Sequence, residues 1–154
     1  MKILNADSYY SYNNEAIGLV AISSILKLNR KLSISKAMLI LPLILHDPTM
    51  NYLQRKNVRI KSVDQLISDK SIYISNFNKR FISMLPVTLN CLYLLEKLEL
   101  IKIEEGNVIR IGEIQLDKKK LGKRGNKVYK SVDNVNNILK SSDYYLYLQL
   151  RVEL

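Results

Sequence analysis

The sequence predicts a mainly α-helical protein with a small antiparallel β element. First, glycine and proline are scarce, with 5 and 3 residues in a chain of 154, and the apolar segments are long, which favours helices. Second, residues 88–98 carry apolar side chains at helical spacing. Third, residues 101–111 alternate between apolar and polar side chains around a turn that contains glycine. A helix that leads directly into a short hairpin forms the second half of a winged helix, so the predicted arrangement is winged-helix-like.

Length and composition set the expected domain organisation. A chain of 154 residues with 47% hydrophobic and 25% charged residues can bury one sizeable core. We therefore expect a single domain over residues 1–154. Within it we expect the winged-helix-like unit at about residues 76–112, a basic loop at residues 117–130, and a C-terminal helix and strand at residues 131–154.

The net charge of +10 makes nucleic acid, an acidic protein or an anionic membrane surface the candidate partners. The first residues lack the apolar run of a secretory signal, and a single cysteine fits a reducing compartment. The longest apolar run, residues 37–45, is far shorter than the roughly 20 residues of a membrane span. The expected location is therefore the cytoplasm, without a membrane partner.

The first helix is expected to follow a polar lead-in rich in tyrosine. Asn13 or Asn14 can cap this helix, and Glu15 suits its positive end. Apolar residues then surround the helix almost completely until residues 29–31, which predicts burial on most sides. The lead-in contributes three candidate partner-contact residues, namely Tyr9, Tyr10 and Tyr12.

The second helix is expected to begin at Ser33 or Ser35 and to be kinked or split by Pro42. His46 lies near its end, where a lone histidine usually caps or packs. Residues 51–61 then carry four basic residues and no acid, and Ser62 stands three residues before a glutamine, which is the spacing of a capping box.

The next helix is expected to begin at Asn76, to be interrupted by Pro86 and to continue to about residue 98. Residues 104–107 form the expected turn of the following hairpin. The helix is expected to turn one apolar face to the core. This face comprises Val87, Cys91, Leu94, Leu95 and Leu98.

A run of basic residues without an acid follows the hairpin. Two glycines, Gly122 and Gly125, punctuate the run, which predicts a loop that is mobile at least in part. Two interpretations remain open, a solvated basic loop or a contact with nucleic-acid phosphates or an acidic partner. The candidate contact residues are Lys118, Lys119, Lys120, Lys123, Arg124, Lys127 and Lys130.

The C-terminal segment is predicted to contain a short amphipathic helix after Ser131 and then a strand. Leucine or valine occupies every second position from residue 146 to residue 154, which is the period of a strand. Such a strand would either complete the sheet of the hairpin or pair with another chain. Tyr145 and Tyr147 on this segment are further candidate partner-contact residues.

The sequence predicts no catalytic residue, metal ligand or cofactor site, and therefore no enzyme. One histidine and one cysteine cannot form a tetrahedral zinc site, and Cys91 is expected to face the core. The adjacent turn acids Glu104 and Glu105 are typical of a solvated surface. No glycine-rich nucleotide-binding motif is present, so any ATP chemistry would belong to a partner.

The charge of the predicted wing, which is the hairpin at residues 101–111, and of the helix before it distinguishes a protein adapter from a DNA-reading protein. A winged helix that reads DNA presents positive or neutral residues on its recognition helix and wing. Here acidic residues outnumber basic ones, which favours protein contacts. The acidic residues are Glu96, Glu99, Glu104 and Glu105, and the basic residues are Lys97 and Lys102. The alternatives are a stand-alone winged-helix transcriptional regulator that binds DNA and a homodimer joined by terminal strands.

Several apolar blocks carry a resemblance to a known family. The first is the run from Leu39 to Thr49, LILPLILHDPT, followed by NFNKRF at residues 76–81 and by Leu85 and Pro86. The segment YNNEA at residues 12–16 fits the same pattern. Residues 9–112 thus resemble the middle components of bacterial ABC three-component systems.

The resemblance implies partners and a role. These systems couple a large ABC ATPase, often related to SMC and Rad50 proteins, to an effector in defence against phages or plasmids. A member of this family is expected to be a non-enzymatic adapter that bridges the ATPase and the effector. The assembly would engage DNA through the basic residues between Lys118 and Lys130.

Overall fold

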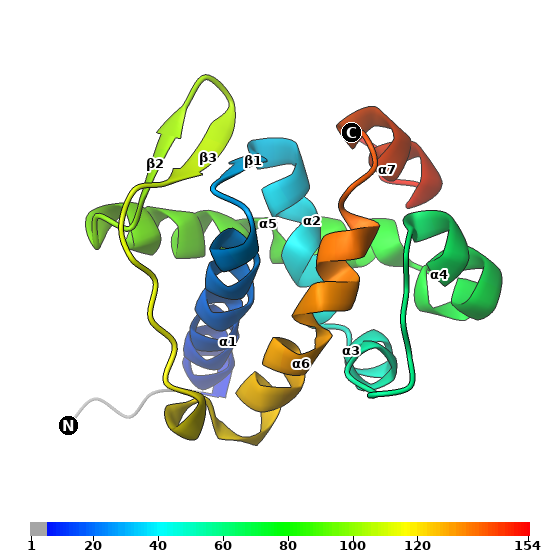
Figure 1. Cartoon of the computed structure of the whole chain (residues 1–154), viewed down its shortest axis with the longest axis horizontal. Helices are drawn as coiled ribbons and strands as arrows, with labels where there is room; N and C mark the ends of the chain where they lie inside the picture. Colours follow the sequence, from blue (N-terminus) through cyan, green and yellow to red (C-terminus); the bar gives the residue numbers. More distant parts are fainter. Residues whose placement is uncertain (1–5) are drawn as a thin grey trace.

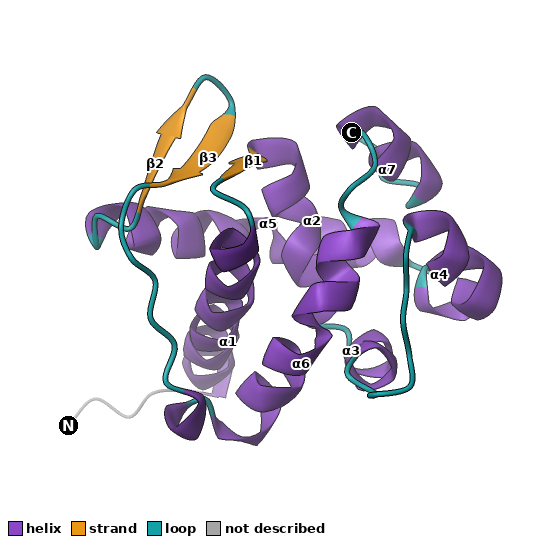
Figure 2. Cartoon of the chain, viewed as in Figure 1, coloured by secondary structure: helices purple, strands orange, loops and turns teal. Residues whose placement is uncertain are grey.

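The computed structural model describes residues 6–154, with side chains from residue 14 onward. It consists of helices with one small antiparallel sheet at one edge (Figures 1 and 2), which confirms the predicted mainly α-helical class with a small antiparallel β element. The α-helices are α1 (Ala6–Leu28), α2 (Ile34–Ile44), α3 (Asp47–Leu53), α4 (Val63–Lys70), α5 (Phe77–Lys97), α6 (Gly122–Ile138) and α7 (Asp143–Gln149). The strands are β1 (Lys31–Ser33), β2 (Ile101–Glu104) and β3 (Asn107–Arg110), and the 3-10 helices are η1 (Ser71–Tyr73) and η2 (Lys118–Lys120).

Helix α1 lies at the centre of the packing, where it contacts α2, α5 and α6. Its Ala21, Ile22 and Ile25 are completely buried, as expected for a helix with apolar residues on most sides. The prediction that Asn13 or Asn14 caps this helix is wrong, because the helix already begins at Ala6. The lead-in tyrosines therefore belong to the first turns of α1, and their side chains lie outside the described residues.

The hairpin after α5 forms as predicted. Strands β2 and β3 pair antiparallel, and the turn residues Glu105 and Gly106 both have positive φ, as a two-residue hairpin turn requires. The third strand, β1, pairs with β3, so the sheet order is β1-β3-β2. The element order α1, β1, α2, α5, β2 and β3 is compatible with the predicted winged-helix-like arrangement, with α3, α4 and η1 inserted before α5.

The buried face of α5 differs from the predicted one. Thr88, Cys91, Leu92 and Leu95 are buried, whereas Leu94 and Leu98 from the predicted core face are exposed. Apolar residues recur at helical spacing on more than one face of this segment. Spacing alone therefore does not select the face that packs against α1 and α2. The apolar residues on the other faces of α5 lie on the surface of the protein.

The predicted C-terminal strand is wrong, because residues 143–149 form α7. Leu146 and Leu150 are buried four residues apart, while Leu148 between them is exposed, which is helical spacing. The Ser142 side chain accepts a hydrogen bond from the Tyr145 N–H and caps the helix. The helix ends at Gln149, and Arg151, two residues later, has the positive φ of 56° that is common just past a helix C-terminus.

The predicted basic loop at residues 117–130 is also wrong. Residues 118–120 form η2, and α6 extends from Gly122 through the remainder of the run. Gly125 and Val128 are buried and extend the apolar stripe of the later α6 residues toward its N-terminus. A Cβ atom at Gly125 would lie 3.0 Å from the Leu121 Cβ, so this glycine allows close packing rather than a flexible loop.

Two predicted helix starts are confirmed. Ser33 caps α2 by accepting from the Lys36 N–H at 3.1 Å, and Ser62 caps α4 by accepting from the Gln65 N–H at 3.2 Å. Asn76 precedes α5 in a left-handed conformation but forms no side-chain cap. Both α2 and α5 continue past their internal prolines, Pro42 and Pro86, so neither proline splits its helix.

Candidate functional site

The structure separates the predicted basic residues into three groups. Arg124 donates to the Asp47 carboxylate at 3.1 Å and to the Leu45 carbonyl, and Lys127 donates to the Asn51 amide oxygen at 3.1 Å. These contacts attach the start of α6 to α3. Lys118 stacks over the Tyr129 ring, with its ammonium 4.8 Å from the ring centroid. Lys119, Lys120, Lys123 and Lys130 are exposed.

An open groove with a volume of about 510 Å³ lies between residues 54–61 and α6. Five exposed basic side chains line this basic groove, together with one carboxylate, Asp133. None of the ion pairs between described side chains involves these five residues. The basic residues are Arg55, Lys56, Arg59, Lys61 and Lys130.

Two asparagines of α6 hold residues 54–61 in place. The buried Asn134 amide donates to the Leu53 and Val58 carbonyls, at 2.7 and 3.1 Å, and its oxygen accepts from the Ile60 N–H at 2.9 Å. Asn137 donates to the Ile60 carbonyl at 3.1 Å. The segment that carries four of the basic residues therefore has its backbone anchored to a helix, which limits the geometries open to it.

The four basic residues of residues 51–61 are evident in the sequence, but their proximity to Lys130 is not. About seventy positions separate the two segments, and only the Asn134 and Asn137 contacts bring them together. The sequence does contain one signal for this arrangement, a pair of asparagines three residues apart on an amphipathic helix. Their side-chain amides can form hydrogen bonds with an extended backbone segment.

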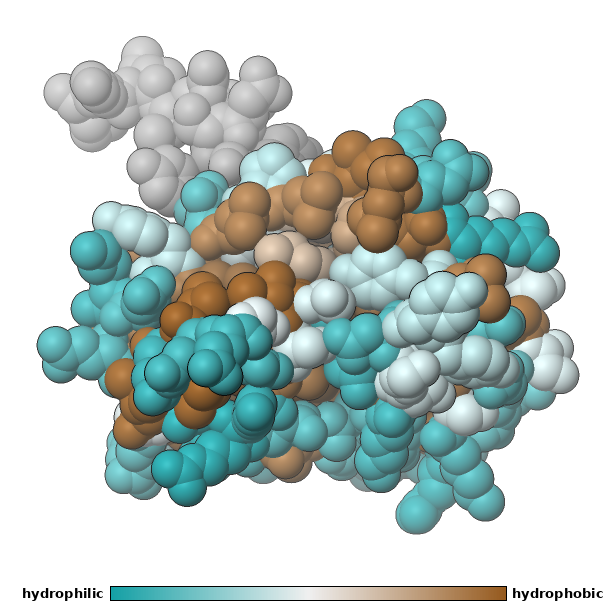
Figure 3. All heavy atoms as spheres, turned by 90° about the horizontal axis from the view of Figure 1, so that it is seen from above, coloured by the Kyte–Doolittle hydropathy of each residue, from teal (hydrophilic) through white to brown (hydrophobic). Residues whose placement is uncertain are grey.

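A second surface lies along α5. Four apolar residues at spacings of four, three and four form one exposed stripe, which we call the α5 stripe: Ile82, Pro86, Leu89 and Tyr93. Three of these side chains are more than half exposed, with 54% for Ile82, 54% for Leu89 and 57% for Tyr93. Figure 3 shows that apolar side chains also gather in a band on the face seen from above, with hydrophilic side chains beside it. An aligned row of large apolar residues on a helix is typical of a protein interface.

The predicted acidic character belongs to the end of α5 and not to the hairpin that follows it. Glu96, Glu99 and Glu105 are exposed. Lys102 forms an ion pair with Glu104 at 2.7 Å, which lowers the pKa of Glu104 through that hydrogen bond and removes most of the local effect of the lysine. Glu105 and Arg110 are the other charged residues of the hairpin, which is therefore neutral overall, whereas at the end of α5 the acidic Glu96 and Glu99 outnumber Lys97.

The two C-terminal tyrosines that we considered as partner contacts bond within the chain. The Tyr147 hydroxyl donates to the Ser35 carbonyl at 2.7 Å, its ring packs edge-on against Phe81, and burial raises its pKa to about 12. The Tyr145 hydroxyl donates to the Asp64 carboxylate, which raises the Tyr145 pKa. Both residues connect α7 to its neighbours.

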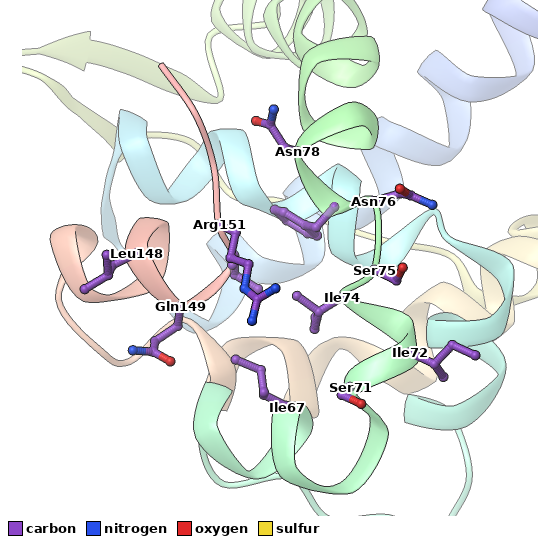
Figure 4. Close-up of a pocket in the computed structure, with 12 residues that line it drawn as sticks. Ile67, Ser71, Ile72, Ile74, Ser75, Asn76, Asn78, Leu148, Gln149 and Arg151 are labelled. Atoms are coloured by element: carbon purple, nitrogen blue, oxygen red, sulfur yellow. The ribbon is translucent and has the colours of Figure 1, made fainter.

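A pocket of about 650 Å³ lies between η1, the start of α5 and the end of α7 (Figure 4). Its side chains are mainly aliphatic, hydroxyl and amide groups, and Arg151, just after the end of α7, points into it (Figure 4). Arg151 is the single ionisable residue of this lining, so the pocket contains no acid–base pair.

The surroundings of Cys91 and His46 are those of residues that pack and form internal hydrogen bonds. Burial, followed by the effect of Glu15, raises the Cys91 pKa to about 12, so the thiolate is disfavoured. The His46 Nδ1 lies 2.7 Å from the Thr49 hydroxyl oxygen, and its ring packs against Tyr73. Within the described part of the chain, no group of three histidine, cysteine or acidic residues is placed to hold a metal ion.

The stability of the protein is expected to depend on the charge of His46. Burial and the nearby Arg80 lower the His46 pKa from 6.5, with Asp47 opposing them. The unfolded chain therefore binds a proton more readily than the folded one, so the free energy of unfolding should decrease as the pH falls below about 6.5. Urea unfolding at several pH values between about 5.5 and 7.5 measures this slope, because carboxyl groups titrate at lower pH. A His46→Gln variant should be nearly flat over that range, and an equal slope in the variant would contradict the assignment.

Comparisons with known proteins identify the family. None of the described helices is long and apolar enough to cross a membrane. No curated protein and no solved structure matches the chain. A family model does match, that of the ABC-three component (ABC-3C) system Middle Component 3, over residues 4–153. Because this match covers nearly the whole sequence, the chain belongs to the Middle Component 3 family of ABC-three component systems.

Proposed function

We propose that this protein is a non-enzymatic adapter that bridges a large ATPase of the SMC type and an effector protein within a bacterial defence system. Membership of a family of middle components supports a role between two other components. The observation that carries the adapter role is the α5 stripe, an aligned row of exposed apolar residues on the helix that precedes the wing.

The same surface argues against a stand-alone DNA-reading regulator. In a winged helix that reads DNA, the helix before the wing enters the major groove and needs polar or basic side chains to contact base edges and phosphates. Here Ile82, Leu89 and Tyr93 occupy that position, and the end of the same helix carries more acidic than basic residues. The apolar residues suit the desolvated centre of a protein interface, where aromatic and aliphatic side chains contribute most of the binding energy. The acidic residues would repel DNA phosphates.

Two features support a role without catalysis. Cys91 and His46, the residue types most often used as nucleophile and base, are committed to packing, and ATP chemistry would belong to the ATPase component. We assign the protein to the cytoplasm, where such an assembly would meet foreign DNA. Contact of the assembly with DNA would use exposed basic side chains of this chain, and the lead-in tyrosines remain candidates for protein contacts.

The test is a pull-down from the native host after nuclease treatment, with the double variant Ile82→Asp, Leu89→Asp. Two buried charges at an interface are costly, so recovery of the ATPase should fall at least about tenfold. The matched control is Ile72→Asp, Leu148→Asp, which places the same charges on exposed apolar positions of η1 and α7. The control should recover the ATPase as the unmodified protein does. Equal recovery with both variants would remove the α5 stripe from the interface, and failure of the unmodified protein to recover an ATPase would overturn the adapter role.

A further inference from the structure

We infer that the basic groove between residues 54–61 and α6 binds the phosphate backbone of double-stranded nucleic acid. This inference deepens the proposed function, on which it rests for the choice of ligand, because it assigns the nucleic-acid contact to a specific surface of this chain. That surface lies away from the wing and is composed of two segments distant in the sequence.

The first argument is the concentration of positive charge. Five basic side chains and one carboxylate line the groove, and all six are exposed to solvent. Repulsion among so many like charges is unfavourable in the free protein, and a bound polyanion relieves it. Each lysine or arginine that neutralises a phosphate also releases condensed counterions, which is the main source of affinity for nucleic-acid backbones.

The second argument is the length of the basic surface. Lys123, Lys127 and Lys130 follow one another on α6 at spacings of four and three residues, so they lie along one side of the helix over about 10 Å. Lys127 bonds a neutral amide and keeps its charge uncompensated. A basic track that leads into a basic groove suits an extended polyanion with regularly spaced phosphates, whereas a single phosphate ion would use only part of it.

The third argument is the rigidity of the groove. Asn134 and Asn137 bond the backbone on both sides of Arg59, and Arg55 lies 5.8 Å from the centroid of the Tyr52 ring. Anchored basic residues lose less conformational entropy on binding than those of a loop without tertiary contacts.

The chemistry of the groove distinguishes between classes of anionic partner. The residues that line it include no aromatic side chain, so it lacks the stacking platforms that single-stranded nucleic acid requires. Its apolar members, Val58 and Ile60, are half-buried or buried, so it offers no anchor pocket for an acidic protein. Side chains that reach phosphates without reading bases fit a duplex backbone bound without sequence preference.

The experiment measures binding of the full-length protein to a fluorescent 20-base-pair duplex of arbitrary sequence at several salt concentrations. The groove variant is Arg55→Gln, Arg59→Gln, Lys130→Gln. The control, Lys27→Gln, Lys79→Gln, Lys140→Gln, removes the same charge from three exposed lysines elsewhere. The groove variant should bind at least about tenfold more weakly, and its plot of log affinity against log salt should be shallower by roughly 2 to 3, at about 0.9 for each lost contact. The control should retain most of the affinity, and thermal unfolding of each variant confirms that it is folded.

Further binding measurements identify the class of ligand and the surface that binds it. DNA and RNA duplexes share the phosphate backbone, so binding of either one supports the inference and identifies the natural class. Tighter binding of a single strand, or equally strong binding of polyglutamate, would overturn it. The variant Lys118→Gln, Lys119→Gln, Lys120→Gln tests the basic residues ahead of α6, and a larger loss there than in the groove variant would also overturn it. The groove variant should still recover the ATPase after nuclease treatment, and the α5 stripe variant should still bind duplex, so failure of one proposal is distinguishable from failure of the other.

Discussion

Replacing Asn134 by alanine is expected to lower the free energy of unfolding by roughly 3 kcal/mol or more. The Asn134 side chain is the partner of the Ile60 N–H and of the Leu53 and Val58 carbonyls, and the residue is buried. Each buried backbone group left without a partner costs about 1–3 kcal/mol, less whatever water recovers by entering the site. Urea unfolding followed by circular dichroism measures the loss.

The same variant separates charge from geometry in the basic groove. Asn134→Ala removes no charge, yet it should weaken duplex binding, because residues 54–61 lose their attachment to α6. The matched control is Asn126→Ala on the same helix, where the amide donates to the Gly122 carbonyl of α6 itself. The control should change stability by less than about 1 kcal/mol and leave binding unaltered. A folded Asn134→Ala variant with unchanged affinity would show that the groove needs only its charges.

Replacing Gly18 by valine is expected to destabilise the fold by about 3 kcal/mol. Gly18 lies where α1 meets α5 and α2, and a Cβ there would come within 2.8 Å of the Cys91 Sγ and 3.2 Å of the Leu41 Cδ1. Both of those side chains are completely buried and have little room to move. Overpacking a tight core costs about 1–3 kcal/mol, and the branched side chain of valine is at the upper end. Thermal or urea unfolding gives the value.

A double mutant identifies the cause of this destabilisation. Cys91→Ala removes the sulfur atom that the new Cβ would meet, so Gly18→Ala should cost less in the Cys91→Ala background than in the unmodified protein. The control for helix propensity is Ala16→Val, an exposed position two residues earlier on α1, with an expected cost of less than about 1 kcal/mol. Strictly additive effects of Gly18→Ala and Cys91→Ala would rule out a steric cause at this contact.

Local chemistry explains which elements could be predicted. The helix-hairpin unit follows from residues close in sequence, because apolar spacing changes from helical to alternating where Glu105 and Gly106 supply positive φ. The Ser33 and Ser62 caps need only a hydroxyl within three residues of an N–H. The family resemblance rested on apolar blocks of the same kind, and the family match confirms it.

Secondary structure was predicted wrongly where one sequence pattern is compatible with two structures. Leucines at positions 146, 148 and 150 alternate as in a strand, but the first and last also lie four residues apart as in a helix. The Ser142 cap and burial of Leu146 and Leu150 select the helix. Likewise, glycines in the basic run suggested a loop, whereas Gly125 permits the close packing of α6.

By itself, the sequence determined the helical class, the hairpin, the family and the excess of positive charge, because these depend on composition and on neighbours within a few residues. Tertiary structure alone decided which face of α5 is exposed and which basic residues share a groove. The exposed face depends on how α5 packs against α1 and α2, and the groove depends on hydrogen bonds from Asn134 to backbone more than seventy residues away. Such long-range contacts leave no periodic pattern in a single sequence, so the two surfaces from which we argue function emerged only with the fold.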